Sequence, residues 1–130
     1  MLRSVVNAQA VAVAGPYSHA VWAGDLLYLS GQTPLDGETG QLIVGSIEQQ
    51  TRRCLASLER VLAQAGLGPD DIVKCNVFLT DMDNFAAMNE TYSDFFDGPL
   101  PARTTIGVTG LPLGARVEIE AVARRAASND

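Results

Sequence analysis

The chain has 130 residues, of which 47% are hydrophobic and 18% charged, and its formal net charge is −6 at pH 7. This length and composition fit a single folded domain over residues 1–130 and exclude a disordered chain. The acidic balance argues against nucleic acid as the main partner, because affinity for a phosphate backbone needs a basic surface. No run of 18 apolar residues is present, so the sequence predicts no membrane segment and a cytoplasmic protein.

The first third of the chain has the pattern of strands. A short edge strand is expected near residues 2–6. Two β-rich runs, 19–22 and 26–29, then flank Gly24-Asp25 with the spacing of a hairpin. The sequence Ser30-Gly31-Gln32 is expected to end the second strand, and a loop rich in turn residues follows.

A helix is predicted to begin after Ser46. Ser46 and Gln49 form a capping-box pattern, in which each side chain reaches the backbone amide of the other residue. Apolar residues then recur at steps of three and four up to Ala65, and Gly66 supplies a stop. Cys54 lies on this apolar stripe, so the sequence favours a buried thiol there.

A strand and a second helix follow. Residues 72–80 alternate, with Val73, Cys75, Val77 and Leu79 expected on the buried face. Helical spacing resumes from 85 to 96 after a cap at Asp81 or Asp83. Asn89 interrupts that apolar stripe, and a buried amide must find hydrogen-bond partners. We therefore interpret Asn89 first as a structural residue and second as a site residue.

Two more strands complete the chain. A β-branched run begins at Arg103 and is bounded by Pro101 and Gly110. Residues 116–124 alternate again, with an apolar face toward the core and a charged face expected in solvent unless a second subunit covers it. This order predicts an α+β fold in which two helices pack on one face of a mixed sheet, and the open face invites oligomerisation.

Several kinds of chemistry have no support in the sequence. The chain has one histidine, His19, and neither a nucleophile elbow nor a phosphate-binding glycine motif. Its two cysteines, Cys54 and Cys75, form no Cys-x-x-Cys motif and are predicted to be free thiols in a reducing compartment. Scattered carboxylates without histidines give no ligand spacing, so no metal site is predicted.

What remains is an arginine and a carboxylate. The guanidinium of Arg103 is always charged and presents a planar fork of donors, which suits two-point capture of a carboxylate. Either Glu118 or Glu120 could hold or deprotonate a water molecule. Together they suit the attack of water on a small substrate that carries its own carboxylate.

Four segments resemble a known family in their order and spacing. They are Gly15-Pro16-Tyr17, Ser30-Gly31-Gln32, Pro101-Ala102-Arg103 and Val117-Glu118-Ile119-Glu120-Ala121. The same segments occur in the RidA family of reactive-intermediate deaminases, also called YjgF/YER057c/UK114. The resemblance spans nearly the whole chain and includes Asn89-Glu90-Thr91-Tyr92 before Phe95-Phe96.

This resemblance implies a chorismate-mutase-like (YjgF-type) α+β fold and a homotrimer with active sites in clefts between subunits. It implies hydrolysis of 2-imino acids such as 2-iminobutanoate and 2-iminopropanoate to 2-oxo acids and ammonia, without a cofactor. By this likeness Arg103 would bind the substrate carboxylate and Glu118 would position the attacking water. The pocket would be lined by Tyr17, Ser30, Gly31, Asn89 and Thr105, and Glu120 would be a structural neighbour.

The sequence departs from many relatives after the arginine. Thr104 and Thr105 stand where serine and cysteine are common, so substrate range would be affected if the cleft used the thiol rather than the backbone of residue 105. Two alternatives remain open. One is a ribonuclease or translation inhibitor, which the net charge of −6 and the single lysine disfavour. The other is a noncatalytic metabolite-binding trimer that uses the same clefts.

Overall fold

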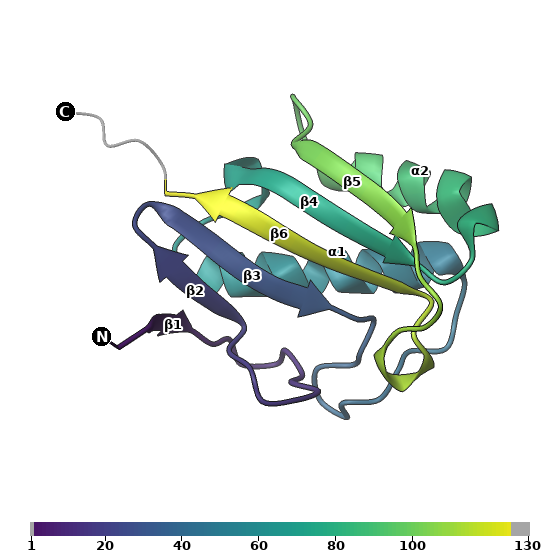
Figure 1. The fold of residues 1–130 in the computed structure, drawn as a ribbon, viewed down its shortest axis with the longest axis horizontal. Coiled ribbons are helices and arrows are strands. Elements are labelled where there is room, and N and C mark those ends of the chain that lie inside the picture. Colours follow the sequence, from purple (N-terminus) through teal and green to yellow (C-terminus); the bar gives the residue numbers. More distant parts are fainter. Residues whose placement is uncertain (1, 126–130) are drawn as a thin grey trace.

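The computed structural model describes residues 2–125, and within them six strands and two α-helices form one layered domain (Figure 1). In chain order the elements are β1 (Ser4–Val6), β2 (Ala20–Ala23), β3 (Leu26–Gln32), α1 (Ile47–Gln64), β4 (Ile72–Leu79), α2 (Phe85–Phe95), β5 (Ala102–Gly107) and β6 (Val117–Arg124). Three short 3-10 helices lie in the connections of this part of the chain.

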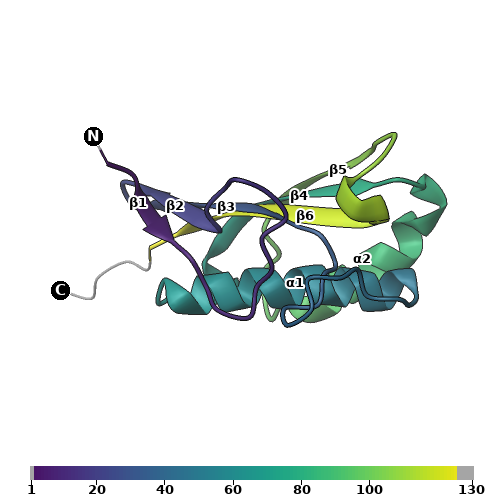
Figure 2. The ribbon, with the colours of Figure 1, turned by 90° about the horizontal axis from the view of Figure 1, so that it is seen from below.

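The strands form one mixed sheet in the order β1-β2-β3-β6-β4-β5. Only β4 and β5 are parallel among these neighbours, and α2 makes the crossover between them. The other pairs are antiparallel. Both helices lie on the same side of the sheet (Figure 2). The predicted α+β sheet with two helices on one face is confirmed.

Helix α1 begins as the sequence predicts. The Ser46 hydroxyl accepts a hydrogen bond from the Gln49 amide at 3.2 Å, and the Gln49 side chain accepts one from the Ser46 amide at 2.8 Å. This reciprocal pair satisfies two amides that the first turn of a helix would leave unpaired. Gly66 follows the helix with a φ of 79°, a left-handed conformation that glycine adopts without strain.

The core lies between α1 and the sheet. Leu58, Val61 and Leu62 of α1 are fully buried against the apolar faces of the central strands. The core-facing residues of β6 are the ones predicted, namely Val117, Ile119, Ala121 and Ala123. Cys54 and Cys75 are buried free thiols, also as predicted. Burial raises the pKa of both thiols, so they remain protonated near neutral pH.

Three local predictions need correction. Val73 is 43% exposed rather than buried, because the pairing of β4 with β6 shifts between Ile72 and Lys74 and puts Ile72 in the core instead. Strand β3 ends at Gln32, the last residue of the predicted terminus Ser30-Gly31-Gln32, so it is longer than the predicted run 26–29. The side chain of Asp81 caps a 3-10 turn, and α2 begins only after that turn.

The other face of the sheet is not covered by helices (Figure 2). Val5, Tyr28 and Ile106 on this face are about half exposed. Lys74 donates a hydrogen bond to the Thr104 hydroxyl across β4 and β5 at 3.0 Å. Neither helix of residues 2–125 combines the length and apolarity needed to cross a membrane.

Candidate functional site

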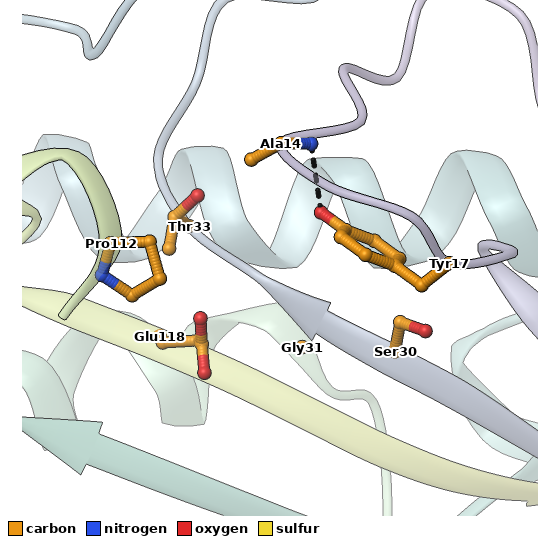
Figure 3. Close-up of a pocket in the computed structure, with 7 residues that line it drawn as sticks. All are labelled: Ala14, Tyr17, Ser30, Gly31, Thr33, Pro112 and Glu118. Atoms are coloured by element: carbon orange, nitrogen blue, oxygen red, sulfur yellow. Dashed lines mark hydrogen bonds between the residues drawn. The ribbon is translucent and has the colours of Figure 1, made fainter.

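The expected site residues fall mainly into two separate pockets. The glutamate pocket has a volume of about 230 Å³ and is lined by Ala14, Tyr17, Ser30, Gly31, Thr33, Pro112 and Glu118 (Figure 3). The arginine pocket has a volume of about 270 Å³ and is lined by Asn89, Tyr92, Ser93, Leu100, Pro101 and Arg103. Three expected residues, Tyr17, Ser30 and Gly31, thus line the pocket with Glu118, and Asn89 accompanies Arg103.

These two pockets lie on opposite faces of the sheet. Arg103 pairs with Cys75, whose side chain is buried on the helix-covered face. Glu118 pairs with Phe78, which is three residues farther along β4 and therefore points the other way. A single chain does not bring the guanidinium of Arg103 and the carboxylate of Glu118 together.

A β-bulge shapes the glutamate pocket. Leu29 pairs with Ala121 and Gln32 with Ile119, so Ser30 and Gly31 together lie opposite Glu120. Bulges of this kind are common beside active sites because they redirect side chains. A Cβ atom at Gly31 would lie 3.0 Å from the carboxylate carbon of Glu118 and 3.0 Å from Oε2. Glycine at this position is what leaves room for the carboxylate (Figure 3).

Hydrogen bonds fix the loop that carries Tyr17 over this pocket. The Tyr17 hydroxyl accepts a bond from the Ala14 amide at 3.0 Å (Figure 3). The Ser30 hydroxyl donates to the carbonyl of Ser18 at 2.7 Å, and the Ser30 amide donates to the carbonyl of His19 at 2.9 Å. Ser30 therefore ties the bulge of β3 to the loop that ends in β2.

His19 contributes to the same loop from the interior. Its side chain is 2% exposed, and Nδ1 accepts a hydrogen bond from the Ala8 amide at 3.0 Å. Its own amide donates to the side chain of Asn7 at 3.0 Å. His19 is therefore a buried anchor of the loop, and it lines neither pocket.

Glu118 is half-buried, and this environment changes its acidity. Burial raises its pKa above the ordinary value of 4.5, and the neighbouring Glu120 raises it further by charge repulsion. Because the two glutamates are two residues apart on β6, they share one face of the sheet. A carboxylate with a raised pKa is a better acceptor for a proton from water than an ordinary one.

Arg103 is held on its inner side by helix α2. Its Nη2 donates to Oδ1 of Asn89 at 2.7 Å, and Nη1 lies 3.9 Å from the sulfur of Met88. The guanidinium carbon stacks over the Tyr92 ring, 4.8 Å from the centroid, and lies 5.7 Å from the Phe85 centroid. The helical spacing in the sequence placed Tyr92 and Phe85 on an apolar stripe. Only their contacts with Arg103 show that these two side chains lie at the candidate site.

Thr105 lies on the same face as Arg103, because it is two residues farther along β5 and pairs with the buried Val77. Its hydroxyl oxygen is buried and has no hydrogen-bond partner among residues 2–125. It lines neither of the two pockets. Residues 2–125 also contain no group of three or more histidine, cysteine and acidic side chains placed to hold a metal ion.

Comparison with known proteins gives consistent matches. The family model described as "Endoribonuclease L-PSP" matches residues 7–125. A mouse protein named 2-iminobutanoate/2-iminopropanoate deaminase is 42% identical over 124 residues, which cover 95% of this chain and 92% of the mouse protein.

Solved structures agree with the fold. The structure of RidA from the Antarctic bacterium Psychrobacter superposes with a TM-score of 0.89 at 36% identity and covers 94% of this chain and 99% of its own. The structure of Escherichia coli TdcF with bound serine also has a TM-score of 0.89, at 35% identity, and covers 95% of this chain and 99% of its own.

Proposed function

The chain belongs to the endoribonuclease L-PSP family, which is the RidA (YjgF) family, and from this premise we propose that it hydrolyses small 2-imino acids to 2-oxo acids and ammonia. Substrates of the size of 2-iminobutanoate and 2-iminopropanoate fit the proposal, which needs no cofactor. The observation that supports it most directly is the pair of pockets, one around an oriented arginine and one around a glutamate of raised pKa. The names of related proteins support the substrate class.

In this proposal Arg103 captures the substrate carboxylate. The guanidinium offers parallel N–H donors that match the two oxygens of a carboxylate. Two-point binding also fixes the plane of the conjugated imine beside it. The serine in the TdcF structure carries a carboxylate next to an amino-bearing carbon, which is the same arrangement as in a 2-imino acid.

Glu118 acts on water. It orients a water molecule toward the imine carbon and accepts one of its protons as the carbon–oxygen bond forms and the C=N electron pair moves to nitrogen. That proton then passes to the amine, the C–N bond breaks as the hydroxyl group gives its own proton to Glu118, and a 2-oxo acid and ammonia leave. Because a protonated imine is already electrophilic, orientation and one base are sufficient, which suits a site without a strong nucleophile.

The complete site in this proposal forms between two copies of the chain. Arg103 and Glu118 face away from each other across one sheet, so a substrate can contact both only if the arginine pocket of one chain meets the glutamate pocket of another. The resemblance to the family favours a closed ring of three chains. The half-exposed apolar residues of the open sheet face, Tyr28 and Ile106 among them, provide surface for such contacts.

The direct test follows the loss of imine. 2-Iminobutanoate is generated from threonine by a dehydratase, surviving imine is trapped with semicarbazide, and the trapped product is measured with wild type, Arg103→Ala or no added protein. We expect wild type to lower the trapped product and Arg103→Ala to leave it at the level without protein. Equal trapping with and without wild type would refute the proposed function.

A complementation experiment tests the site between copies. Arg103→Ala and Glu118→Gln chains are each inactive in this proposal, but a mixed oligomer contains sites with both intact halves. With random mixing of equal amounts, about one quarter of the sites regain both residues. A mixture as inactive as its two parents would contradict a shared site, and sedimentation measures whether the oligomer is a trimer.

The family description makes ribonuclease activity a second candidate. The net charge of −6 gives little attraction for a phosphate backbone. RNA cleavage by protein freed of contaminating nucleases, lost in Arg103→Ala, would favour this candidate. A noncatalytic binder is distinguished by Glu118→Gln, which in a catalyst removes turnover but keeps affinity for a 2-oxo acid.

A further inference from the structure

We propose that Tyr92 and Asn89 are positioning residues, which hold the guanidinium of Arg103 in the plane that receives the substrate carboxylate. This inference rests on the function proposed above. It assigns a role to Tyr92, and it assigns to Asn89 the role of orienting the arginine.

Asn89 holds one edge of the guanidinium. The 2.7 Å bond from Nη2 of Arg103 to Oδ1 of Asn89 joins two side chains that extend from neighbouring elements, β5 and α2. A cationic donor makes this bond stronger than one between neutral groups. The Oδ1 acceptor of Asn89 is thereby used by the arginine, and through this bond Asn89 orients the guanidinium that receives a carboxylate ligand.

Tyr92 holds one face of the guanidinium. Its side chain is 3% exposed, and its ring packs against Phe96 with 5.0 Å between ring centroids. The ring is therefore fixed in the core while its face lies under the cation, 4.8 Å from the guanidinium carbon. Burial, together with the neighbouring Cys75 thiol, raises the pKa of Tyr92, so the ring stays neutral. Tyr92 provides a rigid, uncharged platform.

The remaining contacts close the inner side of the group. Met88 is fully buried and places its sulfur near Nη1, and the centroid of the Phe85 ring lies 5.7 Å from the guanidinium carbon. These contacts all come from α2, and the arginine pocket beside the guanidinium is lined in part by Asn89, Tyr92 and Ser93 of the same helix. A free arginine side chain would lose rotamer freedom on binding a ligand, whereas this one is already ordered.

The test measures binding of 2-oxobutanoate, the expected product, by calorimetry, and it does not require turnover. Asn89→Asp places a carboxylate on Nη2 that competes with the ligand, so we expect the dissociation constant to rise about ten- to a hundredfold. Asn89→Ala removes only the anchor, so a rise of about two- to tenfold is expected. Ala86→Asp is the matched control, because it adds a carboxylate to an exposed position of the same helix.

Tyr92 is tested by a pair of variants. Tyr92→Leu removes the platform, so affinity is expected to fall about two- to tenfold. Tyr92→Phe keeps the ring face and is expected to bind within about twofold of wild type. In the imine assay Asn89→Ala and Tyr92→Leu are expected to raise KM and leave kcat within about twofold, because the carboxylate is held equally in the ground and transition states.

The outcomes separate this inference from the function on which it rests. Wild type that binds 2-oxobutanoate and responds to these variants, but hydrolyses no imine, would sustain the positioning roles and refute the proposed activity. Wild type that hydrolyses imine while Asn89→Asp keeps its affinity and KM would refute the positioning roles alone. If Tyr92→Leu fails to fold, the Asn89 variants still test the positioning roles, since Asn89 is only partly buried. Wild type that neither binds nor hydrolyses would refute both.

Discussion

Gly31→Ala is the substitution for which the structure gives the sharpest expectation. The new Cβ atom would lie 3.0 Å from Cδ and Oε2 of Glu118 and 3.2 Å from its Cγ. These distances are shorter than ordinary van der Waals contacts, so the carboxylate must move by a few tenths of an ångström. Misplacement of a reacting group by about 1 Å can cost about a hundredfold in rate. We therefore expect kcat for 2-iminobutanoate to fall about three- to tenfold, or about 0.7–1.4 kcal/mol in activation free energy.

The fold should tolerate the same substitution. The backbone of Gly31 is not in the left-handed region, and the atoms that crowd the new methyl group belong to the end of a flexible side chain. Thermal unfolding by circular dichroism is therefore expected to stay close to wild type, while semicarbazide trapping records the lost rate. Gly68→Ala is the matched control, because nothing lies within 4 Å of its added Cβ atom and its φ is −141°.

A double-variant comparison shows whether the methyl group acts through the carboxylate. In a Glu118→Gln background, Gly31→Ala is expected to cause little further loss, because the group that it displaces has already lost its function. Full activity of folded Gly31→Ala would refute the assigned role of the Glu118 position. An equal loss in both backgrounds would show that Gly31 acts by another route.

Four further predictions follow from the same geometry. Arg103→Lys keeps the charge but loses the planar fork, so we expect the dissociation constant for 2-oxobutanoate to rise about tenfold or more. Because Glu120 raises the pKa of Glu118, Glu120→Gln is expected to move the acidic limb of the kcat/KM profile to lower pH, and an unmoved limb would show that Glu118 is not the titrating base. The folded state holds the Glu118 proton more tightly than the unfolded chain does. The stability that this group contributes is therefore present below pH 4.5 and is lost as the pH rises through the raised pKa. Glu118→Gln is expected to have a melting temperature no lower than that of wild type at pH 7. Thr105→Val removes a buried hydroxyl without a hydrogen-bond partner among residues 2–125, so the free energy of unfolding is expected to rise by about 1 kcal/mol in denaturant titration. Turnover is expected to be retained if only the backbone of residue 105 serves the site.

Regular periodicity made the fold accessible from the sequence. The capping box at Ser46 and the apolar stripe behind it are local signals, because each involves residues within one or two turns of a helix. The alternation of residues 117–124 likewise fixed which side of β6 enters the core. The errors occurred at irregularities, such as the register shift beside Val73 and the bulge that carries β3 through Gln32. Both features depend on pairing with a strand that is distant in the sequence.

The site shows the same division. Sequence alone predicted that Arg103 binds a carboxylate and that one of the two glutamates acts as a base, and the family resemblance favoured Glu118. It did not identify Tyr92 as the platform for the guanidinium, because an aromatic residue on an apolar helical stripe has the same pattern whether it touches only the core or also a cation. The sequence alone also did not show why residue 31 is glycine.

The sequence by itself determined the elements, their buried faces and the residue types that can do chemistry, because these depend on neighbours a few positions apart. Only the tertiary structure decided that Arg103 and Glu118 face opposite sides of one sheet, since that depends on how β4 pairs with β5 and β6 at once. The direction of a side chain in a sheet follows the parity of its pairing, and pairing between distant strands is set by the packing of the whole domain.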